Sequence, residues 1–336
     1  MTAAALAGND SFIIRARPDR TASSCVIVTV SDEDIERRLN GKGEICFTGE
    51  ILATLINRIL RLDPLVVAVD IDTSSSRFRS LPLQNPKQVP IVWARDVRLQ
   101  DSPDGAYRLA PQPVLGGEET RHSGLPLYPP SGDQIVRAFQ RQFWTTTRPL
   151  DSFHWAILEA ACARGHQTAC TVTQQRRPGP APDHEVLWFL ENYRIDHVLA
   201  QDLGQKQLSD AQNLVNPLFQ RIVILGGSDG DEHETPFGVK IGAELASMAV
   251  ETELAGLRME QLSLPAKLGV KISLAAILIL LYHWLRPRWA FWASLVLAVA
   301  VTAACFFSIY RLLYQVDFVS FLVGMLIEQL YESSSE

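Results

Sequence analysis

The sequence lacks the patterns that would assign a function directly. No Walker A, GxGxxG or HExxH pattern and no internal repeat occurs among its 336 residues, so no cofactor is expected. Basic residues are not concentrated: the nearest approach to a basic cluster is Arg176 and Arg177, and the formal net charge is −6. Because phosphate binding requires clustered Lys and Arg, nucleic acid is not expected as a partner.

Cysteine is scarce and irregularly spaced. The five cysteines, Cys25, Cys46, Cys162, Cys170 and Cys305, form no CxxC pair and no metal-ligand spacing. The simplest interpretation is that they are buried thiols, packed as small hydrophobic side chains. An oxidising compartment would allow one or two disulfides, and Cys162 and Cys170 are close in sequence. Cysteine usage therefore leaves the compartment open.

A signal peptide is not evident, and long apolar runs are confined to one end of the chain. The first residues, MTAAALAGNDSFIIRARPDR, have no apolar core of the kind that a signal peptide needs. Residues 1–265 hold 26 Lys+Arg and 33 Asp+Glu without a long uncharged apolar run, whereas 266–336 hold five basic and four acidic residues. The sequence thus predicts a water-soluble domain over 1–265 and a membrane region over 266–336.

Three transmembrane helices are predicted in the membrane region, at about 268–285, 289–309 and 312–331. The second carries no charge, and at 1.5 Å per residue it is long enough for a hydrocarbon core of about 30 Å. Lys271 interrupts the first, and Asp317 and Glu328 interrupt the third. Basic residues nearly balance on the two sides, so the orientation stays open. The large domain is expected outside the cytoplasmic membrane if an export helix precedes it, and in the cytoplasm otherwise.

The soluble part has the patterning of an α/β fold. Near-continuous apolar runs, typical of strands buried on both faces, occupy 25–30, 65–71, 90–94 and 221–225. Helical spacing and end signals predict helices at 32–39, 49–62, 153–164 and 239–254. The helix 49–62 and the first two strands form a predicted βαβ unit. Stretches 100–133 and 171–185, rich in Pro, Gly and polar residues, are predicted as long surface loops.

Two carboxylates follow the second predicted strand, in the segment VVAVDIDTS. This placement at the carboxyl end of a buried strand resembles the first motif of haloacid dehalogenase-type phosphatases, in which Asp70 would attack phosphorus and Asp72 would act as acid and base. Mg²⁺ would offset the repulsion between carboxylates and phosphate. The later acidic motif of that family is not matched by Asp229 and Asp231. The alternative interpretation is that Asp70 and Asp72 cap a turn or a helix.

The segment RIVILGGSDGDEHE offers two further hypotheses. Gly226, Ser228 and Gly230 match the G-x-S-x-G elbow of α/β-hydrolases, but the charged run and Pro236 that follow favour a loop over the required helix. His233, among acidic neighbours, could bind a divalent cation, although a short acidic loop is more often simply solvated. A glycine-rich turn without a metal remains the simpler interpretation.

The order of the segments over nearly the whole chain resembles the CHASE type 2 domain, a bacterial extracytoplasmic sensory domain with C-terminal transmembrane helices. The resemblance rests on VIVTVSDEDI, DPLVVAVDI, VPIVWARDV, PPSGDQIVRAF and, most specifically, RIVILGGSDGDEHETPFGVKIGAELASMAVETELAG. Family members normally begin with one transmembrane helix, which would lie upstream of Met1 here, ahead of the segment with Asp10 and the arginines 15, 17 and 20. Many continue into a kinase or cyclase, whereas this chain ends at Glu336.

The resemblance implies a membrane-anchored sensor or receptor for signal transduction, without enzymatic activity. It implies binding of an unidentified stimulus by the α/β domain, contact with membrane lipid, a separate effector protein in trans, and a homodimer. The alternatives are the phosphatase using Asp70 and a membrane scaffold that senses nothing. Position at strand ends alone selects the expected ligand-binding residues, which are Asp70, Asp72, Ser228, Asp231, His233 and Thr235.

Overall fold

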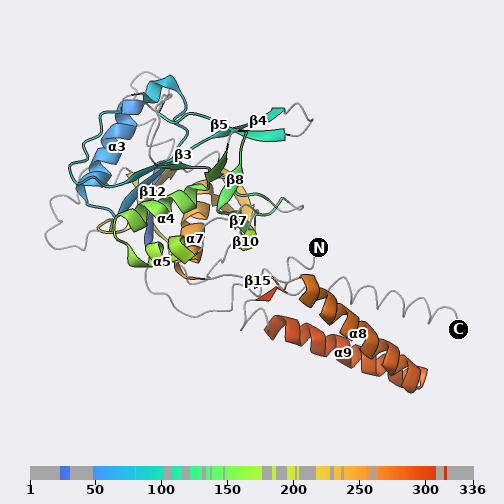
Figure 1. Cartoon of the computed structure of the whole chain (residues 1–336). Helices are drawn as coiled ribbons and strands as arrows, with labels where there is room; N and C mark the ends of the chain where they lie inside the picture. The colour runs from blue at the N-terminus through green and yellow to red at the C-terminus, as the bar shows by residue number, and fades with distance from the viewer. Residues whose placement is uncertain are drawn as a thin grey trace. The chain divides into compact units, whose positions relative to one another are not determined.

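A computed structural model of the chain divides into two compact units (Figure 1). One comprises residues 19–257, and the other comprises residues 1–18 with 258–336. The structure describes residues 23–30, 48–79, 81–101, 107–115, 122–130, 134–136, 138–146, 148–175, 184–186, 195–200, 203, 217–227, 231–235, 238–256, 260–261, 264–307 and 314–315. The predicted helix 32–39 and most of the predicted membrane helix 312–331 lie outside these residues.

The larger unit is built on a six-stranded parallel sheet with the order β11-β1-β12-β2-β3-β6. Its strands are β1 (Cys25–Val30), β2 (Val66–Asp70), β3 (Ile91–Ala94), β6 (Ser123–Gly124), β11 (Asp196–Leu199) and β12 (Ile222–Gly227). The four predicted strands are confirmed at β1, β2, β3 and β12, and the fold is α/β. However, β1 and β2 are not neighbours, because β12 lies between them and pairs with both.

Helices cover both faces of this sheet, because alternate apolar side chains of the same strands are buried on opposite sides. Helix α3 lies over one face, and α4, α5 and α7 lie over the other (Figure 1). Val26 and Val28 of β1 pack with α3, whereas Cys25 and Ile27 pack with α4, α5 and α7. The helices are α3 (Gly49–Arg61), α4 (Phe153–Ala163), α5 (Gln167–Gln175), α7 (Gly242–Leu254) and the short 3-10 helix η1 (Ser76–Phe78). The predicted helices 49–62 and 153–164 are thereby confirmed.

The predicted helix 239–254 begins three residues late. Gly238–Ile241 instead forms strand β14, which pairs antiparallel with β13 (Glu232–Thr235). The hydroxyl of Thr235 donates a hydrogen bond to the carbonyl oxygen of Gly238 at 2.6 Å, and Gly238 has a φ of +92°, which favours glycine. This hairpin delivers the chain to the N-terminus of α7.

The prediction of two long surface loops is wrong for their described residues. Within the first stretch, β6 joins the main sheet and the side chains of Leu125 and Tyr128 are buried; in the second, α5 runs to Gln175. Besides β13 and β14, the larger unit has three further antiparallel pairs among its described strands, β4 (Val97–Asp101) with β5 (Tyr107–Pro111), β7 (Ala138–Gln140) with β10 (His184–Val186), and β8 (Gln142–Trp144) with β9 (Pro149–Asp151). These strands are short and several pair with distant segments, so local composition did not reveal them.

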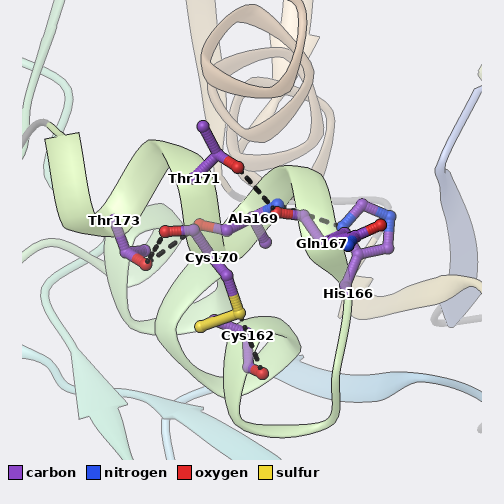
Figure 2. The surroundings of a disulfide bond; sticks show 7 residues. All are labelled: Cys162, His166, Gln167, Ala169, Cys170, Thr171 and Thr173. Atoms are coloured by element: carbon purple, nitrogen blue, oxygen red, sulfur yellow. Dashed lines mark hydrogen bonds between the residues drawn. A yellow bond between two sulfur atoms is a disulfide. The ribbon is translucent and has the colours of Figure 1, made fainter.

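A disulfide joins Cys162 near the end of α4 to Cys170 in α5 (Figure 2). The interpretation of these two cysteines as free thiols is therefore wrong, and the alternative of a bridge between them is confirmed. His166 starts α5, since its Nδ1 accepts a hydrogen bond from the backbone N–H of Ala169 at 3.2 Å. Cys25, by contrast, is a buried free thiol in β1, as the sequence suggested.

Two acidic side chains near the end of α7 fix this helix to its surroundings. Glu251 Oε1 accepts hydrogen bonds from the backbone N–H of Cys25 and from the hydroxyl of Ser23, both at 2.9 Å. Glu253 Oε1 forms a buried ion pair with Nε of Arg141 at 2.6 Å. The first residues of β1 and the turn between β7 and β8 are thus both bound to the same helix.

The described residues of the smaller unit form two helices, α8 (Leu264–Trp284) and α9 (Pro287–Phe307), which pack side by side (Figure 1). Large apolar side chains on both are exposed, with Ile279 70% and Trp284 80% exposed. Across the described stretches of the chain, no helix is long and apolar enough to cross a membrane. The three predicted membrane helices remain a prediction.

Two described residues inside the third predicted membrane helix are not helical. Tyr314–Gln315 forms strand β16, which pairs in parallel with β15 (Glu260–Gln261). The helix predicted over 312–331 is therefore wrong at these two positions, because their backbone groups pair with another segment instead of with a helical turn.

Candidate functional site

The candidate site lies at the carboxyl end of the sheet, where β2 and β12 run side by side. Asp70 is the last residue of β2 and is in register with Gly226 of β12. This edge of a parallel sheet is where α/β proteins usually bind ligands. A Cβ on Gly226 would lie only 2.7 Å from the Cβ of Ala243. Glycine at this position therefore lets the first turn of α7 approach β12, beside Asp70.

Asp231 approaches Asp70 at the N-terminus of α7. The backbone N–H of Gly242, the first residue of α7, donates a hydrogen bond to the carbonyl oxygen of Asp231 at 3.0 Å. A Cβ on Gly242 would collide with the carboxylate of Asp231, and Oδ2 of Asp70 lies 3.2 Å from that same Cβ position. Two carboxylates therefore face one small volume. The N-cap residue, Ile241, has no polar side chain. The negative charges of the two carboxylates therefore interact with the positive end of the helix dipole.

Two aromatic residues complete the cluster. His233 on β13 places Nε2 3.0 Å from Oδ1 of Asp231, and its ring meets the ring of Tyr128 edge to face, with 6.0 Å between the centroids. Tyr128 is only 6% exposed, and none of the described residues forms a hydrogen bond with its hydroxyl. A buried hydroxyl without a partner is costly, which is a reason to expect that something else satisfies it.

The electrostatics of the cluster reflect two carboxylates held close together. Burial, and next the charge of Asp231, raise the pKa of Asp70 to about 7, although His233 lowers it. Burial raises the pKa of Tyr128 well above its usual value, and Asp70 and Asp231 raise it further. The cluster therefore favours a positively charged species or a proton and repels anions.

The structure brings together some of the predicted ligand-binding residues and separates others. Asp70, Asp231 and His233 meet in the cluster. Asp72 is exposed, and its Oδ1 accepts a hydrogen bond from the backbone N–H of Ser74 at 2.8 Å, so its predicted turn-capping role is confirmed. Thr235 is buried and closes the turn between β13 and β14. Ser228 lies outside the described residues, so the hydrolase elbow is not described either.

This geometry gives little support to the phosphatase hypothesis and to the cation-binding hypothesis. Asp72, the acid and base of the phosphatase hypothesis, has its Oδ1 in a local turn instead. Within the described ranges, no group of three or more His, Cys, Asp or Glu side chains is placed to hold a metal ion. The cation hypothesis for His233 therefore has no closed coordination site to support it.

Sequence reasoning missed Tyr128 and the role of Gly242. Tyr128 lies in a proline-rich segment, LPLYPP, that was predicted to be a surface loop, and the structure buries it against residues distant in sequence. Gly242 was placed inside a helix, where its lack of a side chain has no special meaning. Its significance follows only from the approach of Asp231, which local patterns do not encode.

Comparison with known protein families shows that the CHASE2 domain matches residues 4–307, which is most of the chain. No curated protein and no solved structure matches this chain.

Proposed function

The chain belongs to the CHASE2 domain family, whose members are sensory domains, and from this premise we propose that it is a membrane-anchored, non-enzymatic sensor. The α/β domain binds a stimulus at the cluster of Asp70, Asp231, Tyr128 and His233. A change in α7 then passes to the C-terminal helices and from them to a separate effector protein. A homodimer is the proposed assembly.

One observation carries the choice of site: two carboxylates face the same volume at the first residue of α7. A site that holds like charges together is unstable when empty, so a stimulus that relieves the repulsion has free energy available to change the position of α7. A ligand shifts a conformational equilibrium only by its difference in affinity for the two states. Repulsion that disappears on binding provides such a difference.

The contacts of α7 suggest how the change would leave the site. Its first residue touches Asp231, and its last turns are bound through Glu251 to β1 and through Glu253 to Arg141. The helix ends at Leu254, and α8 begins at Leu264. One end of α7 thus contacts the site, and the other end leads within a few residues of sequence to the C-terminal helices. Such a helix is suited to switch between two positions and to pass that change on.

Two features support a position outside the cytoplasm with anchoring in the membrane. The disulfide between Cys162 and Cys170 is of a kind that persists in oxidising compartments, and CHASE2 domains are typically extracellular parts of membrane proteins. Exposed apolar side chains on α8 and α9, such as Ile272, Ile279 and Val296, require a non-aqueous environment or a partner. The proposed environment is membrane lipid.

The location is tested on the full chain in cells. Thiols are blocked with an alkylating reagent under denaturing conditions, and the peptides are compared by mass spectrometry before and after reduction. Peptides with Cys162 and Cys170 are expected to be alkylated only after reduction, because the domain folds in an oxidising compartment. Cys25 is the internal control, since a free thiol is alkylated without reduction. The chain is also expected to stay with the membranes during an alkaline carbonate wash.

Alkylation of Cys162 and Cys170 before reduction would place the domain in a reducing compartment and contradict the proposed location. Release of the intact chain by carbonate would contradict the membrane anchor.

A further inference from the structure

The cluster at the start of α7 also restricts the chemistry of its ligand, an inference that rests on the proposed function. Its polar groups are the carboxylates of Asp70 and Asp231, which face the shared volume, and the buried hydroxyl of Tyr128, whose ring lies against the ring of His233 beside Asp231. Carboxylates only accept hydrogen bonds when ionised, and a phenol can accept one as well. An anionic ligand would add a further negative charge, so the carboxylates disfavour anions and favour a cation that donates hydrogen bonds.

Metal ions fit this volume poorly. The described residues supply no group of three or more His, Cys, Asp or Glu side chains for a metal, and Nε2 of His233 already lies 3.0 Å from Asp231. An ammonium group has different needs: it carries one positive charge and three N–H donors, and it has no acceptor. The two carboxylates of the shared volume and the nearby hydroxyl of Tyr128 offer three acceptors for the three donors on one nitrogen.

Tyr128 is the observation that points to a ligand independently of the two carboxylates. Tyr128 is only 6% exposed, and its hydroxyl has no hydrogen-bond partner among the described residues. Burial raises the pKa of this hydroxyl, and the charges of Asp70 and Asp231 raise it further. An N–H donor placed beside Tyr128 would give the hydroxyl oxygen a hydrogen bond.

We propose that this cluster binds a primary amine in its ammonium form, with Asp70, Asp231 and Tyr128 as the three acceptors. The side chain of Asp231 is 62% exposed, so the rest of the ligand extends toward solvent on the side of Asp231. Asp70 is the more enclosed of the two carboxylates, and an ammonium ion beside it stabilises its ionised form. Binding joins the two carboxylates through one cation and removes the repulsion that separates them.

Thermal unfolding of the purified full chain in lipid nanodiscs tests this inference at pH 8. The probes are ethylammonium, tetramethylammonium and magnesium chlorides at equal ionic strength. Ethylammonium at about ten times its dissociation constant is expected to raise the Tm by about 2–4 °C, since a ligand that binds only the folded state stabilises it. Tetramethylammonium carries the same charge without an N–H donor and is expected to leave the Tm unchanged.

Variants locate the binding. Asp231→Asn and Tyr128→Phe are each expected to weaken ethylammonium binding by about tenfold, because each removes one charged or polar acceptor. Asp72→Asn, which removes a carboxylate outside the cluster, is the matched control and is expected to bind as the wild type does.

Three results would overturn the inference: an equal Tm shift with tetramethylammonium, a shift with magnesium alone, or full ethylammonium binding in Asp231→Asn. None of these results would by itself refute the proposed sensor. The coupling between the site and the C-terminal helices is tested separately, by hydrogen exchange in the absence of any ligand.

Discussion

Replacing Asp70 with asparagine is expected to stabilise the protein at pH 8 by about 2–4 kcal/mol and to change its stability by less than about 1 kcal/mol at pH 4. The pKa of Asp70 is raised from 3.8 to about 7 in the folded state, by burial and then by Asp231. The folded state therefore holds this proton more tightly than the unfolded state does. The stability that this carboxyl contributes is fully present below pH 4 and is lost as the pH rises toward 7, because ionisation is unfavourable in the folded state. Asparagine has no proton to lose and stays neutral, so the variant does not undergo that loss.

Urea unfolding of wild type and Asp70→Asn at pH 4, 6 and 8 measures this difference. Asp72→Asn is the matched control, because Asp72 is exposed and accepts a local hydrogen bond from the backbone N–H of Ser74, and its effect is expected to be small. A loss of stability in Asp70→Asn at pH 8 would mean that burial and Asp231 do not oppose the ionisation of Asp70, and the site as described would be wrong. Stability gained by removing a side chain is expected where that side chain serves binding rather than folding.

Arg141→Met is expected to lower the free energy of unfolding by about 3–5 kcal/mol, the largest loss predicted for this protein. Nε of Arg141 and Oε1 of Glu253 are 2.6 Å apart, and the two side chains are only 3% and 1% exposed. The guanidinium also lies over the ring of Trp155, 5.5 Å from its centroid. Removing the arginine leaves the charge of Glu253 buried without its ion-pair partner, and this penalty exceeds the value of the pair itself.

A double-mutant cycle separates the ion pair from packing. Glu253→Gln in the Arg141→Met background is expected to recover part of the loss, because it removes the buried charge that has lost Arg141. Lys87→Met is the control: Lys87 pairs with Asp63 at 2.9 Å, but its side chain is 51% exposed, so a loss below about 1 kcal/mol is expected. Equal losses for Arg141→Met and Lys87→Met in urea unfolding would show that α7 is not held by the buried pair.

The sequence predicts the centre of the sheet well because burial leaves a plain signal there. Residues 25–30 and 221–225 are near-continuous apolar runs, and each coincides with a strand buried on both faces. The position of β12 between β1 and β2 has no such signal, since strand order depends on pairing between distant segments. β11 and β6 were missed for a similar reason: they are short edge strands in polar or proline-rich sequence.

The site is predictable only in part. Asp70 was identified because a carboxylate at the end of a buried strand is recognisable in sequence, and Asp231 and His233 because they follow another such strand. Tyr128 was missed because its burial depends on β13 and on the cluster itself, which come from other parts of the chain. The same limit applies to Gly242, whose missing side chain matters only where Asp231 approaches.

The most direct test of the sensor is whether a change at the site reaches α8 without any ligand. Gly242→Ala introduces a Cβ at the position of the Asp231 carboxylate, and this side chain, which is 62% exposed, must move away from the start of α7. The lost interaction between the carboxylate and the helix N-terminus is worth about 0.3–1 kcal/mol, enough to speed local opening by about two- to fivefold. Amide hydrogen exchange of the full chain in nanodiscs compares this variant with wild type, with Asp72→Asn as the control. The coupling proposed for the sensor predicts faster exchange in both α7 and the first turns of α8 in Gly242→Ala alone. Faster exchange confined to α7, with α8 as in wild type, would contradict it and favour a scaffold that does not sense.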